Sequence, residues 1–187
     1  VLLEPYGGQV LGLDVGTTTK LTAIFAGGTL VGFTIASWIL NRGADPVMMA
    51  GAGAALGLPA FAMVIAAAST QSQAMFSIGV AMIGCGAGLF GHGTLTATMR
   101  TAPSGQVGMA LGAWGAVQAT AAGVGAALGG IMRDLGRGIV IDPALPPVTS
   151  GYIMVYAREM ILPATALVIL RPLLRHPASA IPSTKVV

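Results

Sequence analysis

Five apolar runs, each about as long as a bilayer is thick, constrain this chain more than any other feature. They cover residues 21–40, 47–68, 75–97, 107–132 and 152–170. A helix needs about 20 apolar residues to cross the hydrocarbon core. Only 8% of the 187 residues are charged and 55% are hydrophobic, whereas a soluble domain carries roughly a quarter charged residues. The sequence therefore predicts an all-α, polytopic membrane bundle over residues 1–175 and a cytoplasmic tail at 176–187.

The polar breaks between the runs carry most of the basic residues and predict an orientation. If the five spans alternate, one side of the membrane receives Lys20, Arg133 and Arg137. The opposite side receives more basic residues, namely Arg42, Arg100, Arg171, Arg175 and Lys185. Because Lys and Arg accumulate in cytoplasmic loops, the second side, with the C-terminus, is predicted to be cytoplasmic.

The first twenty residues have their own pattern. Residues 1–13 are apolar except for Glu4 and Gln9, and a polar turn with Asp14, three threonines and Lys20 follows. We expect residues 1–13 to be the outer end of one further span. The chain starts without methionine and without the basic region of a secretory signal, so we also expect it to be a piece of a longer polypeptide.

Glycines four residues apart recur in the spans and predict close helix contacts. That spacing places both glycines on one helix face, and small residues let membrane helices approach closely. The pairs are Gly28/Gly32, Gly53/Gly57, Gly84/Gly88, Gly108/Gly112 and Gly125/Gly129. A glycine-rich chain also produces such pairs by chance.

Several classes of function lack their sequence signals. There is no phosphate-binding loop and no nucleophile–base pair, so we expect no enzyme. The single Cys85 excludes a disulfide framework and a cysteine-based zinc site, and no metal site is expected. Basic residues stand singly, without the clustering of a nucleic-acid interface. The classes of function that remain are binding and transport within the membrane.

Charged residues at membrane depth are costly unless partnered, and three stand out. Glu4 precedes Pro5 and two glycines, which loosen a helix. It is either a binding residue for a ligand or proton, or one half of a buried ion pair. Arg158 and Glu159 lie inside the last span, and adjacent residues do not face each other on a helix. Each needs its own partner, and Glu4 is a candidate for Arg158, which alternatively extends to the membrane surface.

His92 is the best candidate for holding a flat ligand. It stands between Gly91 and Gly93, and an imidazole nitrogen is a natural axial ligand to a macrocyclic metal. The alternative is a histidine hydrogen-bonded to a neighbouring helix. Trp114 and Gln118 are one helical turn apart and share a face. They line the same cavity, or they form an ordinary helix contact.

Two runs near the start, residues 1–13 (VLLEPYGGQVLGL) and 15–23 (VGTTTKLTA), closely resemble the signature of the PucC/LhaA family. The resemblance continues around Trp114 and through residues 129–136. Members of this family are bacteriochlorophyll-delivery proteins of the major facilitator superfamily. The resemblance implies the C-terminal half of that twelve-span fold, comprising the end of span 7 and spans 8–12.

The resemblance also implies a function. It suggests a light-harvesting antenna assembly factor in the photosynthetic inner membrane, which binds or delivers bacteriochlorophyll, with carotenoid or lipid as further ligands. His92, Glu4, Gln118 and Trp114 are then candidates for pigment binding. Expected partners are the antenna α/β polypeptides and the reaction-centre–antenna core complex. Two alternatives remain: a proton-coupled transporter of a small solute that uses Glu4 or Glu159, and a structural subunit of a photosynthetic complex.

Overall fold

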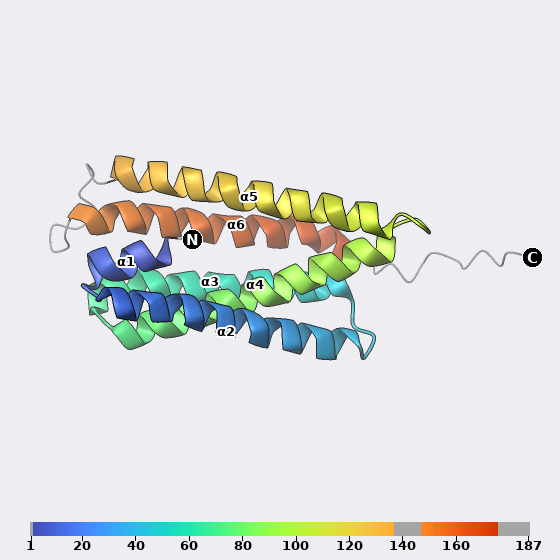
Figure 1. Cartoon of the computed structure of the whole chain (residues 1–187), viewed down its shortest axis with the longest axis horizontal. Helices are drawn as coiled ribbons and strands as arrows, with labels where there is room; N and C mark the ends of the chain where they lie inside the picture. Colours follow the sequence, from blue (N-terminus) through green and yellow to red (C-terminus); the bar gives the residue numbers. More distant parts are fainter. Residues whose placement is uncertain (1, 137–146, 176–187) are drawn as a thin grey trace, which may run out of the picture.

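The computed structural model describes residues 2–136 and 147–175, and all secondary structure in these ranges is α-helical. Five helices are long and apolar enough to cross a membrane, and one short helix precedes them. They are α1 (Leu3–Val10), α2 (Val15–Leu40), α3 (Pro46–Thr70), α4 (Gln73–Thr101), α5 (Val107–Gly136) and α6 (Pro147–Arg175) (Figure 1). The predicted membrane bundle is confirmed. The expected tail at 176–187 and Arg137 lie outside the described residues.

Helices α2, α3 and α4 begin before their predicted apolar runs, and a polar residue caps the start of each. The Asp14 side chain accepts a hydrogen bond from the Gly16 backbone N–H at 3.1 Å, so α2 begins at Val15. The predicted polar turn up to Lys20 was therefore wrong. Its threonines form the first helical turns, where Thr18 and Thr19 hydroxyls donate to the Val15 carbonyl.

Similar caps start the next two helices. Asp45 accepts from the Val47 backbone N–H at 2.7 Å, with Pro46 in the first helical position. Ser72 accepts from the Met75 backbone N–H at 3.3 Å and starts α4. Side-chain oxygens at these positions satisfy N–H groups that have no partner within the helix.

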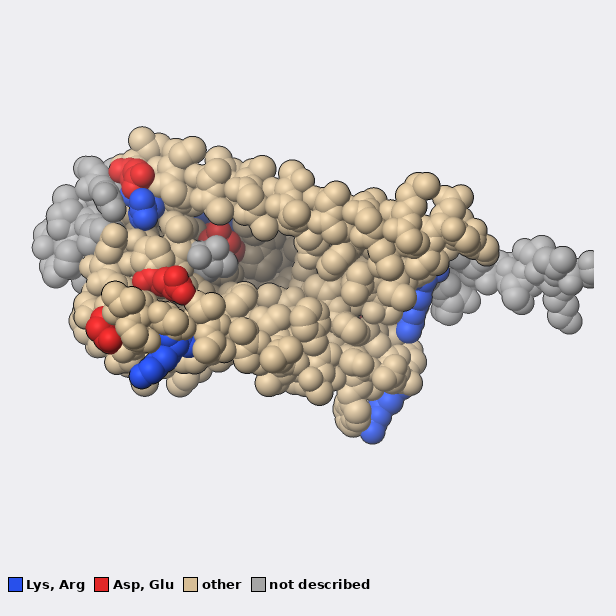
Figure 2. Space-filling view, in the orientation of Figure 1, with Lys and Arg blue, Asp and Glu red and all other residues tan. Residues whose placement is uncertain are grey.

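Charged side chains gather at the two ends of the bundle. On the visible face, one end carries both acidic and basic groups, the other shows only basic ones, and the broad middle band shows no Lys or Arg (Figure 2). Arg42 and Arg100 lie at the α2–α3 and α4–α5 connections, respectively. This distribution suits a protein surrounded by lipid between two polar interfaces.

Glycines fix the tightest contact in the bundle, between α2 and α4. A Cβ atom added at Gly28 or Gly32 would lie 2.3 or 2.2 Å from a carbonyl oxygen of α4. In the same way, Cβ atoms added at Gly84 and Gly88 of α4 would lie 2.2 and 2.4 Å from carbonyl oxygens of α2. On α3, a Cβ at Gly53 would lie 2.5 Å from the Gly86 carbonyl oxygen of α4. For these glycines the prediction of helix contacts is confirmed.

The same prediction was wrong for most of α5. Added Cβ atoms at Gly108, Gly112 and Gly125 would meet nothing within 4 Å. The helix meets α6 closely only near its C-terminal end, where a Cβ at Gly136 would lie 2.7 Å from the Gly151 Cα. Most of α5 is exposed in the described structure, and its glycines up to Gly125 face open space.

Helix α1 is wedged between α2 and α6. It runs in the opposite direction to α6, and its N-terminal end lies part-way along the bundle, away from either end (Figure 1).

Candidate functional site

An open groove of about 700 Å³ lies between α2 and α4, at the level of His92. Its wall combines three large apolar groups, three small polar groups and the imidazole. These residues are Phe33, Leu95, Trp38, Thr34, Ser37, Asn41 and His92. The glycine contacts between α2 and α4 hold the two walls at a fixed separation. The groove therefore offers an apolar, aromatic surface with polar groups along it.

The imidazole of His92 is half-buried and packs edge-on against Phe33, with ring centroids 5.8 Å apart and planes at 68°. No hydrogen bond to either ring nitrogen is found within the described part of the chain. The alternative of a histidine hydrogen-bonded to a neighbouring helix therefore does not describe this structure. Both nitrogens remain available to a ligand in the groove.

The two glycines that flank His92 have different surroundings. Gly93 packs against α3, where an added Cβ would lie 2.7 Å from the Pro46 carbonyl oxygen and the Ala50 nitrogen. A Cβ at Gly91 would make ordinary contact with Phe33 at 3.8 Å. Space for a ligand comes from the gap between α2 and α4, and Gly93 serves helix packing.

Aromatic and basic groups meet at the end of the groove where α2 terminates. The Arg42 guanidinium carbon lies 3.5 Å from the centre of the Trp38 ring. Trp38 is 56% exposed, so its other surface is open to the surroundings. A cation over an aromatic face is attracted by the ring's electron density. The pair places a positive charge at one end of an otherwise neutral groove.

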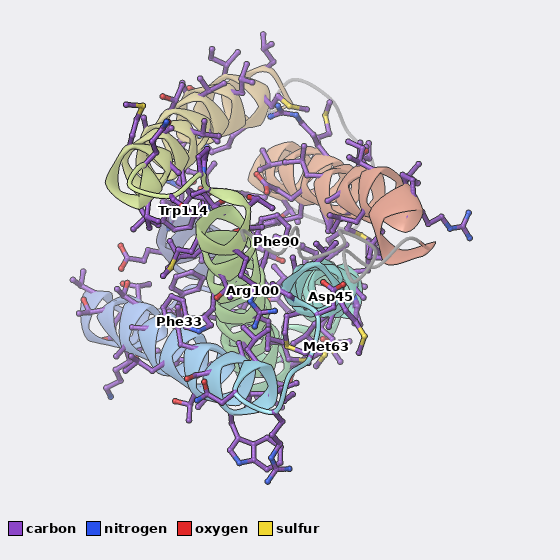
Figure 3. The ribbon with its side chains drawn as sticks, turned by 90° about the vertical axis from the view of Figure 1, so that its right-hand side faces the viewer. Phe33, Asp45, Met63, Phe90, Arg100 and Trp114 are labelled. Carbon is purple, nitrogen blue, oxygen red and sulfur yellow. The ribbon has the colours of Figure 1, made fainter. Side chains whose placement is uncertain are left out.

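Trp114 and Gln118 do not reach this groove. The Trp114 indole N–H donates to the Thr94 hydroxyl at 3.2 Å, which ties α5 to α4. Thr94 is two residues after His92, about 200° around the helix, so the two contacts lie on opposite faces of α4. Figure 3 shows Phe33 between α2 and α4 and Trp114 on the α5 side. Gln118 is exposed on α5.

Glu4 lies at a separate position. Its carboxylate accepts a hydrogen bond from the Thr22 hydroxyl of α2. It lines a pocket of about 350 Å³ that includes Leu21 and Phe25. The predicted ion pair with Arg158 does not form; among the described residues, the one ion pair is Arg133–Asp134, at 2.8 Å. Glu4 points to α2 because Tyr6, two residues later and on the opposite face, holds α1 against α6.

Glu159 lines another cavity, of about 310 Å³, between α2, α3, α4 and α6. It is half-buried, and no hydrogen bond or ion pair to it is found in the described ranges. Arg158 is also half-buried and points elsewhere on α6, as expected for adjacent helical residues. The three charged residues grouped in the prediction are thus spread over separate positions.

Comparison with known proteins identifies the family. The family model described as "PUCC protein" matches residues 1–178. The chain belongs to the PucC family. It is 66% identical to Protein PucC of Rhodovulum sulfidophilum over 73% of this chain and 30% of the relative. It is 51% identical to Protein PucC of Cereibacter sphaeroides over 96% of this chain and 39% of the relative.

A more distant relative has a name that includes bacteriochlorophyll. It is the "Bacteriochlorophyll synthase 44.5 kDa chain" of Rhodobacter capsulatus, 32% identical over 73% of this chain and 33% of the relative. The chain thus spans well under half the length of these curated relatives. No solved structure matches it.

A cluster of buried tyrosines that the sequence of this PucC-family chain did not reveal explains the Leu-Glu-Pro-Tyr-Gly-Gly run at residues 3–8. Tyr6 is fully buried, and its ring packs against Tyr152 and Tyr156 with centroids 5.3 and 5.2 Å apart. Its hydroxyl donates to the Val64 carbonyl oxygen of α3 at 3.0 Å. A Cβ at Gly7 would lie 3.0 Å from a Leu21 methyl group, so the glycine lets α1 lie close to α2.

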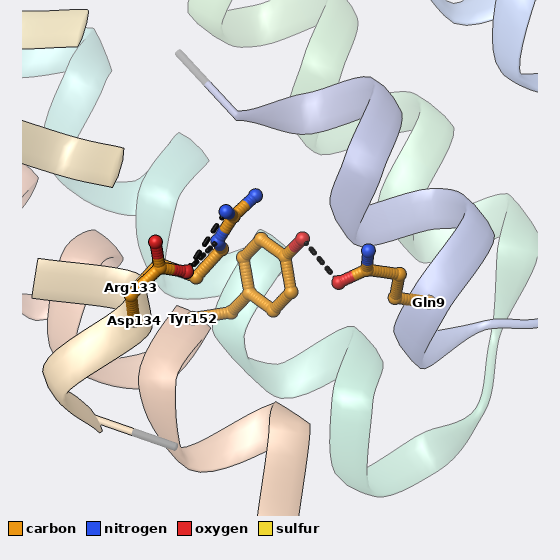
Figure 4. Close-up of polar contacts among 4 residues, drawn as sticks. All are labelled: Gln9, Arg133, Asp134 and Tyr152. Atoms are coloured by element: carbon orange, nitrogen blue, oxygen red, sulfur yellow. Dashed lines mark hydrogen bonds and ion pairs between the residues drawn. The ribbon is translucent and has the colours of Figure 1, made fainter. Parts of the chain in front are cut away.

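Two further polar contacts surround this cluster. The Tyr152 hydroxyl donates to the Gln9 side-chain oxygen at 2.8 Å, and the Arg133–Asp134 pair lies on the other side of the Tyr152 ring (Figure 4). The spacing of four between Tyr152 and Tyr156 places them on one helix face. This spacing was the available sequence signal, but it did not reveal α1 as the partner.

Proposed function

We propose that this PucC-family chain is part of a light-harvesting antenna assembly factor that binds bacteriochlorophyll in the His92 groove. The observation that carries the proposal is a half-buried imidazole that has no hydrogen bond to any of the described residues and faces an aromatic groove of about 700 Å³. The family membership and the relative named for bacteriochlorophyll synthesis support the choice of ligand.

The groove's chemistry suits a flat pigment with polar substituents. A neutral imidazole nitrogen can coordinate the central metal of a macrocycle. Phe33, Trp38 and Leu95 offer apolar contact to the ring and its tail, while Ser37 and Asn41 offer hydrogen-bonding groups to its edge. The volume falls within the usual range of roughly 300–1,000 Å³ for ligand sites. An open groove also suits transient binding, because it leaves one side of the ligand free for transfer.

Partners and location follow from the same proposal. The antenna α/β polypeptides and the reaction-centre–antenna core complex are the proposed partners, and the inner photosynthetic membrane is the proposed location. The open glycines of α5 suit a partner helix, because small residues allow close backbone approach. The proposed cytoplasmic side is the end that shows only basic groups on its visible face, where Arg42 and Arg100 lie.

The test replaces His92 in the complete polypeptide and measures the pigment that co-purifies. In His92→Phe, the side chain fills the space beside Phe33 and removes the nitrogen. We expect the ratio of bacteriochlorophyll to protein to fall at least tenfold, while antenna polypeptides still co-purify. In His92→Gly, added imidazole should restore pigment binding by supplying the missing ligand.

The matched control is Trp114→Phe, which changes an aromatic residue of α5 that contacts the opposite face of α4. Its pigment content should stay as in the unchanged protein. If bound pigment and its absorption maximum are unaltered in His92→Phe, the proposal of His92 as ligand is wrong. Glu4, Gln118 or a backbone carbonyl would then be examined.

A further inference from the structure

A cation stands at one end of the His92 groove. Trp38 and Asn41 are the groove residues nearest the C-terminal end of α2, and the Arg42 guanidinium carbon lies 3.5 Å from the centre of the Trp38 ring. The described residues that line the groove include no Lys, Arg, Asp or Glu. Arg42 is therefore the charge that acts on a ligand lying along the groove.

The guanidinium of Arg42 has donors to spare. It is exposed, and within the described ranges it takes part in no ion pair and no side-chain hydrogen bond. Asp45, the nearest acidic residue along the sequence, uses its carboxylate to cap α3 at the Val47 N–H. A guanidinium presents five N–H groups in a planar fork that matches a carboxylate. Contact with the Trp38 ring limits the orientations of that fork.

The length of the groove suits one planar ligand that spans from His92 to this end. The Phe33 ring contacts the His92 imidazole, and Trp38 is five residues farther along α2, a rise of about 7.5 Å. This length is comparable to the reach from the centre of a tetrapyrrole ring to a carboxylate on a short side chain at its edge. A ring whose metal is bound by His92 can therefore place an edge substituent beside Trp38 and Arg42.

We propose that Arg42 selects a tetrapyrrole with a free carboxylate, so that the groove prefers the unesterified acid of the pigment to its ester. The selection rests on the proposed function, in which His92 binds the central metal. Bacteriochlorophyll is an ester of a long apolar alcohol, and removal of that alcohol leaves a propionate at the edge of the ring. The propionate accepts two parallel, charge-assisted hydrogen bonds from the guanidinium, whereas the neutral ester accepts only weaker ones.

The level of Arg42 in the bundle also favours an anionic group. The residue lies in the α2–α3 connection, at the end whose visible face shows only basic groups (Figure 2). Arg and Lys in such connections lie near the membrane surface, where a carboxylate avoids the cost of burial in hydrocarbon. An ester with its carboxyl group at this level would begin its long apolar alcohol at a polar surface. The free acid has no such conflict.

Absorption titrations of the complete polypeptide in a non-ionic detergent test this selection. The probes are the free acid of bacteriochlorophyll, its methyl ester and bacteriochlorophyll itself. The acid and the methyl ester have nearly the same shape and no long alcohol, so the ratio of their dissociation constants isolates the charge. We expect the acid to bind about tenfold more tightly at low salt, from the strength of a hydrogen bond to a charged group. Because Arg42 is exposed, high salt should reduce this preference.

Three variants assign the preference to a residue. Arg42→Gln removes the charge, so it should bind the acid and the methyl ester about equally. Arg42→Lys keeps the charge without the planar fork, so it should retain part of the preference. The matched control is Arg100→Gln, which removes an exposed cation from the α4–α5 connection and should keep the full preference.

Equal affinities of the unchanged protein for the acid and the methyl ester would overturn the selection by Arg42. A preference that persists in Arg42→Gln would do the same, as would an equal loss of preference in Arg42→Gln and Arg100→Gln. The variant His92→Phe tests the proposed function separately, because loss of the metal ligand should weaken both probes alike. Unchanged affinities in His92→Phe would contradict the proposed function, whereas a missing preference for the acid contradicts only the selection by Arg42.

Discussion

Replacing Gly32 with alanine tests whether close backbone contact between α2 and α4 holds the bundle together. The added Cβ would lie 2.2 Å from the Cys85 carbonyl oxygen and 3.1 Å from the Gly88 Cα. Side-chain Cβ atoms essentially never lie within 3.0 Å of another heavy atom. The two helices must therefore separate locally by about 0.8 Å, since the obstructing atoms belong to the backbone and cannot rotate away.

The expected loss of stability follows from two opposing terms. Overpacking of this kind costs about 1–3 kcal/mol, and the upper end applies because separation also weakens dispersion contacts along both helices. Alanine in place of glycine stabilises the folded protein by up to about 1 kcal/mol, because it lowers the entropy of the unfolded chain. We expect Gly32→Ala to lower the free energy of unfolding by about 2 kcal/mol.

Gly112→Ala is the matched control, since its Cβ would meet nothing within 4 Å. This variant should be neutral or more stable by up to about 1 kcal/mol. Reversible unfolding in mixed micelles, followed by far-ultraviolet circular dichroism against the mole fraction of SDS, measures both. The reasoning would be refuted if the two variants had equal stabilities within about 0.5 kcal/mol.

Two further predictions concern the N-terminal region. Tyr6→Phe keeps the ring contacts but leaves the Val64 carbonyl oxygen without its buried donor. We therefore expect the free energy of unfolding to fall by about 1–2 kcal/mol in the same assay. If Tyr6→Phe were as stable as the unchanged chain, the hydrogen bond between Tyr6 and Val64 would not contribute to stability. The Thr17 hydroxyl lowers the pKa of the Asp14 carboxyl, so the folded state favours the carboxylate. This stabilisation is present above the ordinary pKa of Asp and is lost as the pH falls through the lowered folded-state pKa. The midpoints of thermal unfolding of Asp14→Asn and of the unchanged chain, measured at a series of pH values, should converge at low pH. A difference between the two midpoints that stays constant with pH would show that protonation of Asp14 is not coupled to stability.

Hydropathy predicted most of the fold. The five apolar runs located the spans because a bilayer imposes a minimum apolar length on any helix that crosses it. Boundaries were less accurate at the start of α2, where Thr17–Lys20 appear polar enough for a turn. Threonine hydroxyls can bond to a carbonyl of the preceding turn, as Thr18 and Thr19 do here, and this lets a polar stretch remain helical.

The candidate site was harder to predict because spacing within one helix says nothing about which neighbour it faces. His92 was identified from its residue type, but its contact with Phe33 depends on how α2 and α4 pack. Glu4 and Arg158 were paired by charge alone, and the orientation of α1 separates them. Glycines of α5 and α4 have the same spacing, yet only those of α4 are in close contact throughout the helix's middle turns.

The contact between Tyr152 and Gln9 joins residues 143 positions apart in the chain. During synthesis, α1 enters the membrane first among these helices, whereas α6 is the last to be made. Until α6 is in place, the side of α1 that carries Tyr6 has neither of its tyrosine partners, and the Gln9 side chain lacks its hydroxyl donor. Closure of the bundle around α1 therefore cannot precede the synthesis of α6, and any factor that protects this surface meanwhile must leave before α6 docks.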